Sequence, residues 1–296
     1  MPLGAGLVII RHMPPGAEGP DRAVHPVDRA RLTERAPLAP PVHRYLPADD
    51  LVDRVRHYWV PVWDLPAGSE VVEQVLQYPA CLMVIASDYA RLYGVTTGLS
   101  SVTLAGCGWA VGVMLQPGAG PAVFGRGAAG DLADRHENLA GLPHFADTIR
   151  RVHQAMDGSP DLADRHTSAI AAVEDALRRA PAPDGDALLL NRVVDLVESD
   201  PSLLTVADLA RRCGVGERRL QRLTERFLGL SPKWLIQRRR LHEAVHQLKH
   251  GTTALARLAA DLGYTDQAHF TRDFRRVTGY APGQFSRTLG RDARAP

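Results

Sequence analysis

Cysteine is scarce in this chain, with three residues in 296 and no Cys-x-x-Cys pair among them. Cys81, Cys107 and Cys213 therefore fit neither a disulfide framework nor a structural zinc site, and they indicate a reducing cytoplasm. Long apolar runs are also missing: no stretch approaches the ~20 apolar residues that a membrane span needs. The opening MPLGAGLVIIRHMPP lacks the basic region of a signal peptide. We expect a cytoplasmic protein with no membrane partner.

Signatures of common enzymes are absent as well. The sequence contains no GxSxG, no Gly-rich phosphate loop and no HExxH. The hexapeptide DLADRH occurs twice, at 131–136 and 161–166, and its Asp131, Asp134 and His136 are candidate metal ligands. No His/Cys pairing accompanies them, and aspartates near helix N-termini explain them equally well, so we favour chance or local capping. We expect no catalytic residue, no metal and no cofactor.

The charge is distributed unevenly although the net charge is only +2. Residues 191–296 hold 19 Lys+Arg against 11 Asp+Glu, a balance of +8, whereas residues 1–190 hold 16 against 22, a balance of −6. An acidic front and a basic back indicate an anionic partner at the C-terminal end. A merely basic surface is the alternative until a motif decides.

The pattern of residue types along the sequence predicts an α+β protein in which a β-rich part precedes a helical part. Short β-favouring runs punctuated by Gly and Pro, followed by segments with helical periodicity, predict a small β-barrel or sandwich with trailing helices. The last hundred residues read as all-α. The resulting division is a loosely ordered tail at 1–40, a β-rich domain at 41–180, a linker at 181–187 containing PAPDGD, and a helical domain at 188–290.

The helical part contains an internal repeat. RLQRLTERFLGLSPKWL (219–235) aligns with HFTRDFRRVTGYAPGQF (269–285) at an offset of 50, so that Leu220 matches Phe270. Upstream, LTVADLARRCGV aligns with ALARLAADLGY at an offset of 49, so the second copy carries one extra residue in its turn. Between the copies, WLIQRRRLHEAVHQLKHG predicts one continuous amphipathic helix.

Each copy is predicted to be helix, glycine turn, helix. Thr205 with Asp208 resembles a capping box, and Thr252 or Thr253 is a candidate cap for the second copy. Gly214 and Gly263 can take the positive φ that a sharp turn demands. The pattern is that of a helix-turn-helix, whose second helix enters a DNA major groove.

The tandem repeat, with LGYTDQAHFTRDFRRVTGYAP, resembles the C-terminal domain of AraC/XylS-type transcription regulators over about residues 188–288. The front domain is similar to the truncated β-barrel sensor found in one branch of that family, with VGVMLQPGA as the best-matching piece. One position departs from the pattern, because Thr224 stands where the first repeat usually has a Phe that matches Phe274. Phe227, one turn later, is expected to fill part of the gap.

Two sets of side chains are expected to contact DNA. On the exposed faces of the second helices, residues with base-reading chemistry recur, and the resemblance puts base contacts at the same positions; a solvated face is the alternative for any one of them. Further cations are expected at phosphates or in solvent. The base-reading set is Arg218, Gln221, Arg222, Gln267, His269, Thr271 and Arg272, and the phosphate set is Lys233, Arg239, Arg275 and Arg276.

The resemblance implies a sequence-specific regulator that binds double-stranded DNA and is controlled by a small-molecule effector on the front domain. It allows a homodimer, and an activator would contact RNA polymerase. Five aromatic residues are candidates to line an effector pocket, although we favour a core role for most of them: Trp59, Trp63, Tyr78, Tyr93 and Trp109. Two alternatives stay open: constitutive binding without an effector, and an enzymatic front domain in which Cys81 or Cys107 carries thiol or alkyl-transfer chemistry. The effector-binding residues are not identified by the sequence.

Overall fold

A computed structural model of the chain describes residues 12–13, 32, 38–125, 130–250 and 254–292. The expected loosely ordered tail lies largely outside these residues. Its described parts are ordered: His12–Met13 form strand β1, which pairs with β2, and the Leu32 amide donates a hydrogen bond to the Gln74 carbonyl at 2.9 Å.

The front half is built on antiparallel strands. A seven-stranded sheet has the order β1-β2-β3-β8-β5-β6-β9, and β4 pairs with β7 in a separate two-stranded sheet. Every neighbouring pair of strands is antiparallel. The remaining strands are β2 (Val42–Tyr45), β3 (Val55–Asp64), β4 (Glu70–Val75), β5 (Leu82–Ala86), β6 (Ala90–Tyr93), β7 (Ser100–Ala105), β8 (Cys107–Leu115) and β9 (His136–Asn138).

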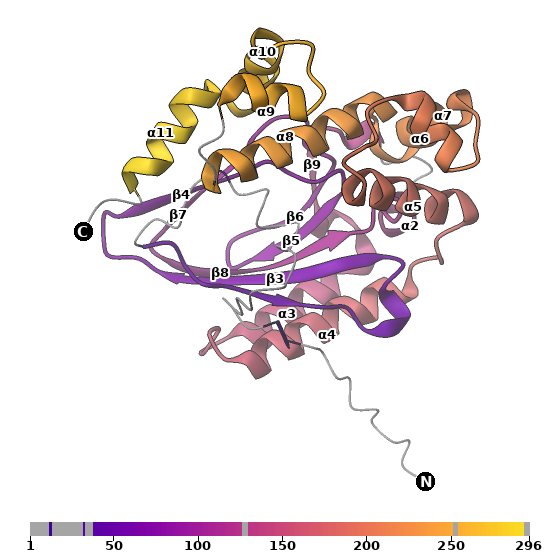
Figure 1. Cartoon of the computed structure of the whole chain (residues 1–296). Helices are drawn as coiled ribbons and strands as arrows, with labels where there is room; N and C mark the ends of the chain where they lie inside the picture. The colour runs from indigo at the N-terminus through magenta and orange to yellow at the C-terminus, as the bar shows by residue number, and fades with distance from the viewer. Residues whose placement is uncertain (1–11, 14–31, 33–37, 126–129, 251–253, 293–296) are drawn as a thin grey trace.

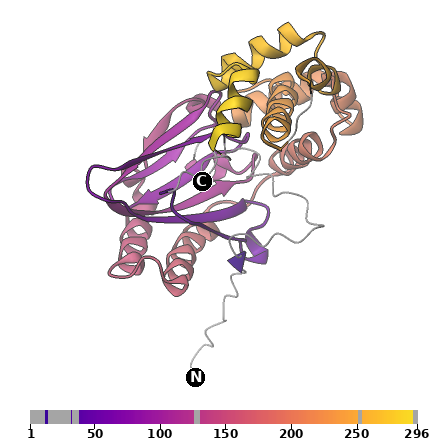
Figure 2. The ribbon, with the colours of Figure 1, turned by 60° about the vertical axis from the view of Figure 1, so that its left-hand side comes forward.

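Short helical pieces connect the strands, and two longer helices, α3 (Ala146–Met156) and α4 (Ala163–Arg179), follow them. Figures 1 and 2 show α3 and α4 on one side of the large sheet and the C-terminal helices on the other. The short pieces are η1 (Asp49–Leu51), α2 (Gly120–Phe124), η2 (Gly130–Leu132), η3 (Leu139–Gly141) and η4 (Pro143–Phe145).

The side chains that alternate along the strands divide between the two sides of the large sheet. Tyr58 on β3, Ile85 on β5 and Val111 on β8 pack with Ile170 and Leu177 of α4 in the largest apolar cluster of the described residues. The opposite face carries Trp59 and Trp63, with smaller residues between them. Alternation along β3 therefore gives one strand a helix-covered face and an aromatic face.

The C-terminal half is all-α, in agreement with the sequence. Its first helix begins at Gly185, with the Asp184 carboxylate accepting a hydrogen bond from the Ala187 amide at the N-cap. The predicted continuous helix between the repeats is α8, and its apolar residues Leu235, Leu241 and Val245 are buried. The helices are α5 (Gly185–Ser199), α6 (Val206–Arg212), α7 (Glu217–Leu228), α8 (Pro232–His250), α9 (Leu255–Asp261), α10 (Gln267–Thr278) and α11 (Pro282–Asp292).

The two repeats use different cores. Residues of α5, α6 and α7, such as Leu190, Leu209 and Leu220, belong to the same apolar cluster as the large sheet. Residues of α9 and α10, such as Phe270 and Phe274, belong to a separate cluster that also contains Leu76 from the segment after β4. Each repeat is therefore packed against a different part of the β-rich half.

Candidate nucleic-acid interface

The first repeat is a helix-turn-helix formed by α6 and α7. Thr205 caps α6 by accepting a hydrogen bond from the Asp208 amide at 3.1 Å, and its hydroxyl also donates to the Asp208 carboxylate at 2.8 Å. The turn at 213–216 contains Gly214 at φ 67°, a conformation that favours glycine. Both the predicted cap and the predicted glycine turn are confirmed.

The second repeat, α9 and α10, is built the same way with a longer turn. Residues 262–266 separate its helices, one more than the four of the first repeat, and Gly263 lies at φ 73°. Thr252 and Thr253 lie outside the described residues, and the N-cap position of α9 is Ala254, which makes no side-chain cap. A cap that the sequence reading missed is Asp266, whose carboxylate accepts from the His269 amide at 2.7 Å and starts α10.

Helix α8 separates the two units. Figure 1 shows α6 and α7 toward one end of α8 and α9 and α10 toward the other. At 1.5 Å per residue, its 19 residues span about 28 Å. That length is close to one turn of B-form DNA, about 34 Å.

The second helix of each repeat buries one face and exposes the other. Leu220 and Phe270, the superimposed anchors, are both fully buried. Phe227 is buried in the largest apolar cluster, and Thr224 is fully buried with its hydroxyl donating to the Gln221 carbonyl at 3.1 Å. The seven residues of the base-reading set lie away from these anchors: Arg218, Gln221, Arg222, Gln267 and Arg272 are exposed, and His269 and Thr271 are half-buried.

The exposed arginines differ in whether they have an acidic partner. On α7, Arg219 and Arg226 form ion pairs with Asp184 and Asp186. On α10, Arg276 pairs with Asp273 at 3.0 Å. Within the part of the chain that the structure describes, four exposed arginines of these helices form no ion pair: Arg218, Arg222, Arg272 and Arg275. Their positive charges are uncompensated, as a site for an anionic partner requires.

The carboxylate of Asp273 on α10 was not anticipated from the sequence. It is 8% exposed and lies between the Arg276 guanidinium, 3.0 Å away at Nη2, and the His269 ring, 3.8 Å away at Nε2. The His269 ring also meets the edge of Tyr264, with ring centroids 5.2 Å apart. The side chains of His269, Asp273 and Arg276 on α10 are thus held by contacts within the second repeat. An acidic residue at i+4 from His269 and at i−3 from Arg276 was the available signal.

Three residues of the phosphate set, Lys233, Arg275 and Arg276, are exposed. The prediction for Arg239 does not agree with its placement. Its side chain is buried, and Nη2 donates hydrogen bonds of 3.1 Å to the carbonyls of Pro201 and Leu203. The loop between α5 and α6 leaves these carbonyls without helical partners, and the guanidinium satisfies them. Burial lowers the pKa of Arg239, and the side chain stabilises the loop instead of reaching a phosphate.

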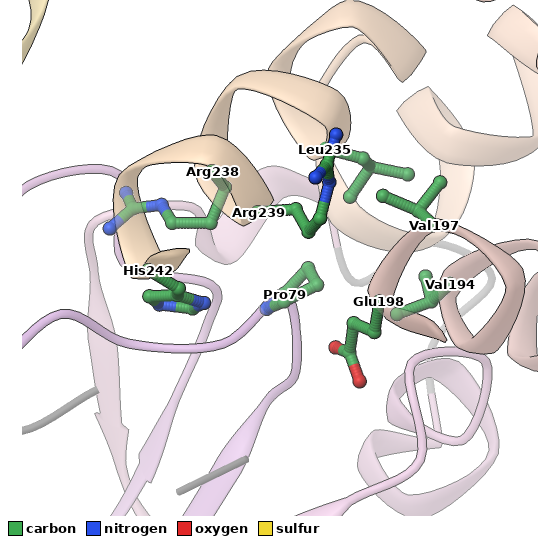
Figure 3. A pocket seen from close by; sticks show the side chains of 8 residues that line it. All are labelled: Pro79, Val194, Val197, Glu198, Leu235, Arg238, Arg239 and His242. Atoms are coloured by element: carbon green, nitrogen blue, oxygen red, sulfur yellow. The ribbon is translucent and has the colours of Figure 1, made fainter. Parts of the chain in front are cut away.

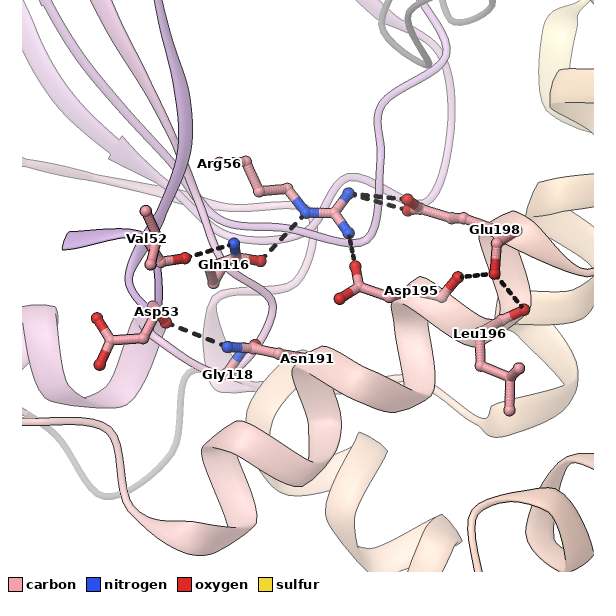
Figure 4. A network of polar contacts seen from close by, with 10 residues as sticks. Val52, Asp53, Arg56, Gln116, Gly118, Asn191, Asp195, Leu196 and Glu198 are labelled. Atoms are coloured by element: carbon pink, nitrogen blue, oxygen red, sulfur yellow. Dashed lines mark hydrogen bonds and ion pairs between the residues drawn. The ribbon is translucent and has the colours of Figure 1, made fainter. Parts of the chain in front are cut away.

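The helical half is joined to the sheet by polar contacts around α5. Arg56 on β3 donates to both carboxylate oxygens of Glu198 at 3.0 Å and to Asp195 at 2.9 Å, as Figure 4 shows. The Asn191 side chain accepts from the Gly118 amide at 2.8 Å and donates to the Asp53 carbonyl at 3.1 Å. Helix α5 is therefore fixed to the β-rich half along its length.

A second set of contacts runs from α8 to the loops of the β-rich half. The His242 ring donates from Nε2 to the Leu76 carbonyl at 2.8 Å and stacks against Tyr78, with centroids 4.4 Å apart. Arg238 donates to the carbonyls of Thr96 and Thr97. Figure 3 shows the small pocket between Pro79 and these helices, whose size suits a water molecule better than an effector.

The five aromatic residues of the front domain divide between the two faces of the sheet. Trp109 is buried on the α3 side, where it meets His153 edge-on at 5.0 Å, and Tyr78 is buried as well. Trp59, Trp63 and Tyr93 are half-buried on the opposite face. The core interpretation fits Trp109 and Tyr78, and the other three form a partly open aromatic surface.

Two glycines on β8 leave the space in which tryptophan rings of β3 pack on the sheet. A Cβ at Gly112 would lie 2.0 Å from Trp59 Cε2, and one at Gly108 would lie 2.5 Å from Trp63 Cζ2. Each ring therefore covers a position at which a side chain would displace it. The packing of the two tryptophan rings on these glycines could not be predicted from the sequence.

The residues considered as metal ligands or reactive thiols make contacts within the fold. Among the described residues, no group of three or more His, Cys, Asp or Glu is arranged to hold a metal ion. Asp134 instead accepts hydrogen bonds from the amide and hydroxyl of Thr97 at 2.7 and 2.6 Å, and in the second DLADRH copy His166 is buried against Tyr45. Burial raises the pKa of the Cys81 thiol to about 12. Across the described residues, no helix is long and apolar enough to cross a membrane.

Comparison with known proteins divides the chain in the same way. Residues 209–288 match a helix-turn-helix domain family, and residues 43–138 match a domain of unknown function, DUF6597. The transcriptional activator RhaS of Escherichia fergusonii is 30% identical over 122 residues, which are 40% of this chain and 43% of RhaS. A putative AraC-like transcription regulator of Streptomyces lividans is 33% identical over 81 residues, 27% of each chain. The chain thus matches less than half the length of these relatives.

Two solved structures are also similar. The C-terminal domain of AraT from Geobacillus stearothermophilus is 25% identical with a TM-score of 0.31, covering 34% of this chain and 84% of that one. ToxT from Vibrio cholerae O395 is 12% identical with a TM-score of 0.39, covering 78% of this chain and 98% of that one.

Proposed function

We propose that the protein is a sequence-specific, DNA-binding transcription regulator of the AraC type, because residues 209–288 match a helix-turn-helix domain family and the chain is similar to an AraC-like regulator over 81 residues. The observation that carries the proposal is the pair of superimposable recognition helices, α7 and α10, each presenting uncompensated arginines on its exposed face. Arg218 and Arg222 lie on the first helix and Arg272 on the second.

The side chains of the base-reading set match the edges of base pairs in the major groove. Arginine binds guanine O6 and N7 with two hydrogen bonds, glutamine binds adenine N6 and N7, and the methyl group of threonine packs on that of thymine. Arg222 and Arg272, at matching positions of the repeat, are the strongest candidates to read guanine. Lys233 and Arg275 supply sequence-independent affinity for phosphate, with Arg276 available once it leaves Asp273.

The length of α8, which joins the two repeats, supports binding of one molecule to successive turns of the major groove. Helix α8 spans about 28 Å, and the two helices stand beyond its ends in sequence. A site read in this way has two recognised segments centred about 10 bp apart.

Regulation by a small molecule is the second part of the proposal. The partly open aromatic face of the sheet, with Trp59, Trp63 and Tyr93, offers an apolar surface for an effector. The same sheet contacts α5 through Arg56, so a ligand that moves β3 also acts on the helical half. We also propose a homodimer and, if the protein is an activator as its relative RhaS is named, a contact with RNA polymerase.

An enzymatic front domain is the less supported function. A thiol whose pKa is about 12 carries almost no thiolate near neutral pH, and the thiolate is the nucleophile. Cys107 is exposed at the start of β8, and among the described residues no group of three or more His, Cys, Asp or Glu is arranged to hold a metal ion.

The test uses the full chain and a fragment of residues 181–296, which keeps the Asp184 cap of α5. Randomised-site selection with the full chain should return a two-part motif, and the fragment should bind the selected duplex with an affinity that falls steeply with salt. Absence of any enriched motif, or binding that ignores salt, would refute the DNA-binding proposal. Identical DNA affinity and transcription for full chain and fragment under all growth conditions would refute the effector proposal.

A further inference from the structure

The repeat also superimposes two basic residues on each recognition helix, and one of these four, His269, belongs to the base-reading set as well. At the offset of 50, Arg219 matches His269 and Arg226 matches Arg276. In both helices two basic side chains seven residues apart therefore lie along one flank. The position between them is Leu223 in the first repeat and Asp273 in the second.

In the second repeat, the carboxylate between the two basic groups is part of the recognition helix. Asp273 lies 3.0 Å from Arg276 Nη2 and 3.8 Å from His269 Nε2, and its own side chain is 12% exposed. The pairing moves with α10 as a unit, because all three residues belong to it.

In the first repeat, the carboxylates come from outside the helix. Leu223 is buried in the apolar core and offers no charge. Asp186, in the first turn of α5, lies 3.2 Å from Arg219 Nη2 and 3.7 Å from Arg226 Nη1. Asp184 lies 3.8 Å from Arg226 Nη2. Thus Asp186 stands in the same relation to Arg219 and Arg226 as Asp273 does to His269 and Arg276.

We propose that Asp186 and Asp273 increase the DNA specificity of this protein by pairing with basic side chains of its two recognition helices. The inference rests on the proposed DNA-binding function. DNA phosphates attract every exposed cation regardless of base sequence. A cation paired with a carboxylate contributes less to that attraction, because phosphate must first displace the carboxylate. Binding then depends more on the unpaired Arg218, Arg222 and Arg272.

The effect is modest and measurable. The side chains of Arg219 and Asp186 are 59% and 41% exposed, so the pair is screened by solvent. An exposed ion pair of this kind changes an equilibrium by up to about fivefold. Two such carboxylate pairings, one for each half of the site, change the ratio of specific to non-specific affinity although neither carboxylate contacts a base.

The two carboxylates, Asp273 and Asp186, are supplied by different parts of the fold. Asp273 needs only α10, whereas Asp186 belongs to α5, which is fixed to the sheet through Asn191 and through Arg56 with Glu198. The first recognition helix therefore takes its flanking carboxylate from the segment that leaves the β-rich half, and the second does not.

The experiment uses the full chain with Asp186→Asn and Asp273→Asn. Two duplexes of equal length are the probes: one from randomised-site selection and one with the same composition in scrambled order. Each variant should bind the scrambled duplex about two- to fivefold more tightly, with a salt slope steeper by about one. Affinity for the selected duplex should change less, so the ratio of specific to non-specific affinity should fall.

Two controls identify the cause. Asp161→Asn removes an exposed carboxylate from the turn before α4 and changes the net charge equally, and it should leave the ratio unchanged. In a background of Arg219→Gln with Arg226→Gln, Asp186→Asn should have no further effect, because the cations through which it acts are gone. Asp184 is not substituted, because it also caps α5.

The outcomes separate the two proposals. If the unmodified chain enriches no motif and binds neither duplex, the DNA-binding function itself fails. If it binds the selected duplex and both variants keep its affinity ratio and salt slope, only the specificity proposal is overturned. Persistence of the Asp186→Asn effect in the Arg219→Gln, Arg226→Gln background would overturn it too, since the carboxylate would then act by repelling DNA. Thermal denaturation of each variant verifies that it is folded.

Discussion

Arg56 on β3 and Glu198 at the end of α5 are 142 residues apart in sequence and joined by two hydrogen bonds, with Nη1 at 3.0 Å from each carboxylate oxygen. Their side chains are 14% and 18% exposed. The pair lies between the sheet and the first helix of the DNA-binding half (Figure 4). Burial raises the pKa of Glu198, while the guanidinium of Arg56 opposes that shift.

Arg56→Ala should destabilise the full chain by about 3–5 kcal/mol, because it leaves the Glu198 carboxylate buried without its main partner. The measurement is the free energy of unfolding from urea denaturation. Arg150→Ala is the matched control, since Arg150 pairs with Asp147 on the surface with both side chains more than half exposed, and it should cost less than about 1 kcal/mol. Equal losses for the two variants would mean that the Arg56 contact is no stronger than a surface pair.

Phe227→Ala should disable the first recognition helix and spare the second. Phe227 is 2% exposed in the apolar core, so truncation should open a cavity and cost about 3–5 kcal/mol. Leu188→Ala is the control, because Leu188 is 37% exposed on α5. Randomised-site selection should show loss of the motif half read by α7 and retention of the half read by α10. Loss of both halves together would contradict independent packing of the repeats.

The parts of the fold that the sequence predicted are those set by local rules. Gly214 and Gly263 mark turns that need positive φ, and Thr205 with Asp208 forms a cap within four residues. Helical periodicity likewise identified the buried side of α8. Each of these signals depends on neighbours in the chain, so it can be read without knowledge of the tertiary structure.

The parts that were missed depend on contacts between distant segments. Periodicity gives no means of recognising that Arg239 would meet carbonyls 36 and 38 residues away, so a basic residue on α8 was expected at a phosphate. The Arg56–Glu198 pair and the docking of Asp186 on α7 are likewise long-range. The aromatic face was ambiguous for the same reason, since alternation along β3 separates Tyr58 from Trp59 but does not say which face is covered.

Thiol labelling should distinguish the three cysteines and test the enzymatic alternative. Burial raises the pKa of the Cys81 thiol to about 12, so Cys81 stays protonated at pH 8, whereas Cys107 is exposed. Burial also raises the pKa of the half-buried Cys213. Iodoacetamide at pH 8 should modify Cys107 first and Cys81 only after unfolding in urea, as followed by mass spectrometry of peptides. Rapid modification of Cys81 in the folded chain would favour thiol chemistry in the front domain.

Gly112→Ala should disturb the aromatic face of the sheet. The new Cβ would lie 2.0 Å from Trp59 Cε2, so the ring must leave the sheet, at a cost of about 1–3 kcal/mol. Tryptophan fluorescence should shift toward longer wavelength as Trp59 becomes more exposed. Gly98→Ala is the control, because its Cβ would meet nothing within 4 Å. An unchanged spectrum and stability for Gly112→Ala would mean that Trp59 is not held by this contact.

Arg222 and Arg272 should read two base pairs about 10 bp apart, because they occupy matching positions on recognition helices at the two ends of α8. Each follows a buried anchor, Leu220 or Phe270, by two residues and so lies on the exposed side of its helix, where it forms no ion pair within the described residues. Replacing either with alanine should weaken binding to the selected duplex by about 1–3 kcal/mol and relax preference at one base pair. Arg275→Ala is the phosphate control: it should weaken all duplexes alike and lower the salt slope by about one. If randomised-site selection returns the unmodified motif for both Arg222→Ala and Arg272→Ala, these arginines do not read bases, and the recognition faces must be assigned to other residues of α7 and α10.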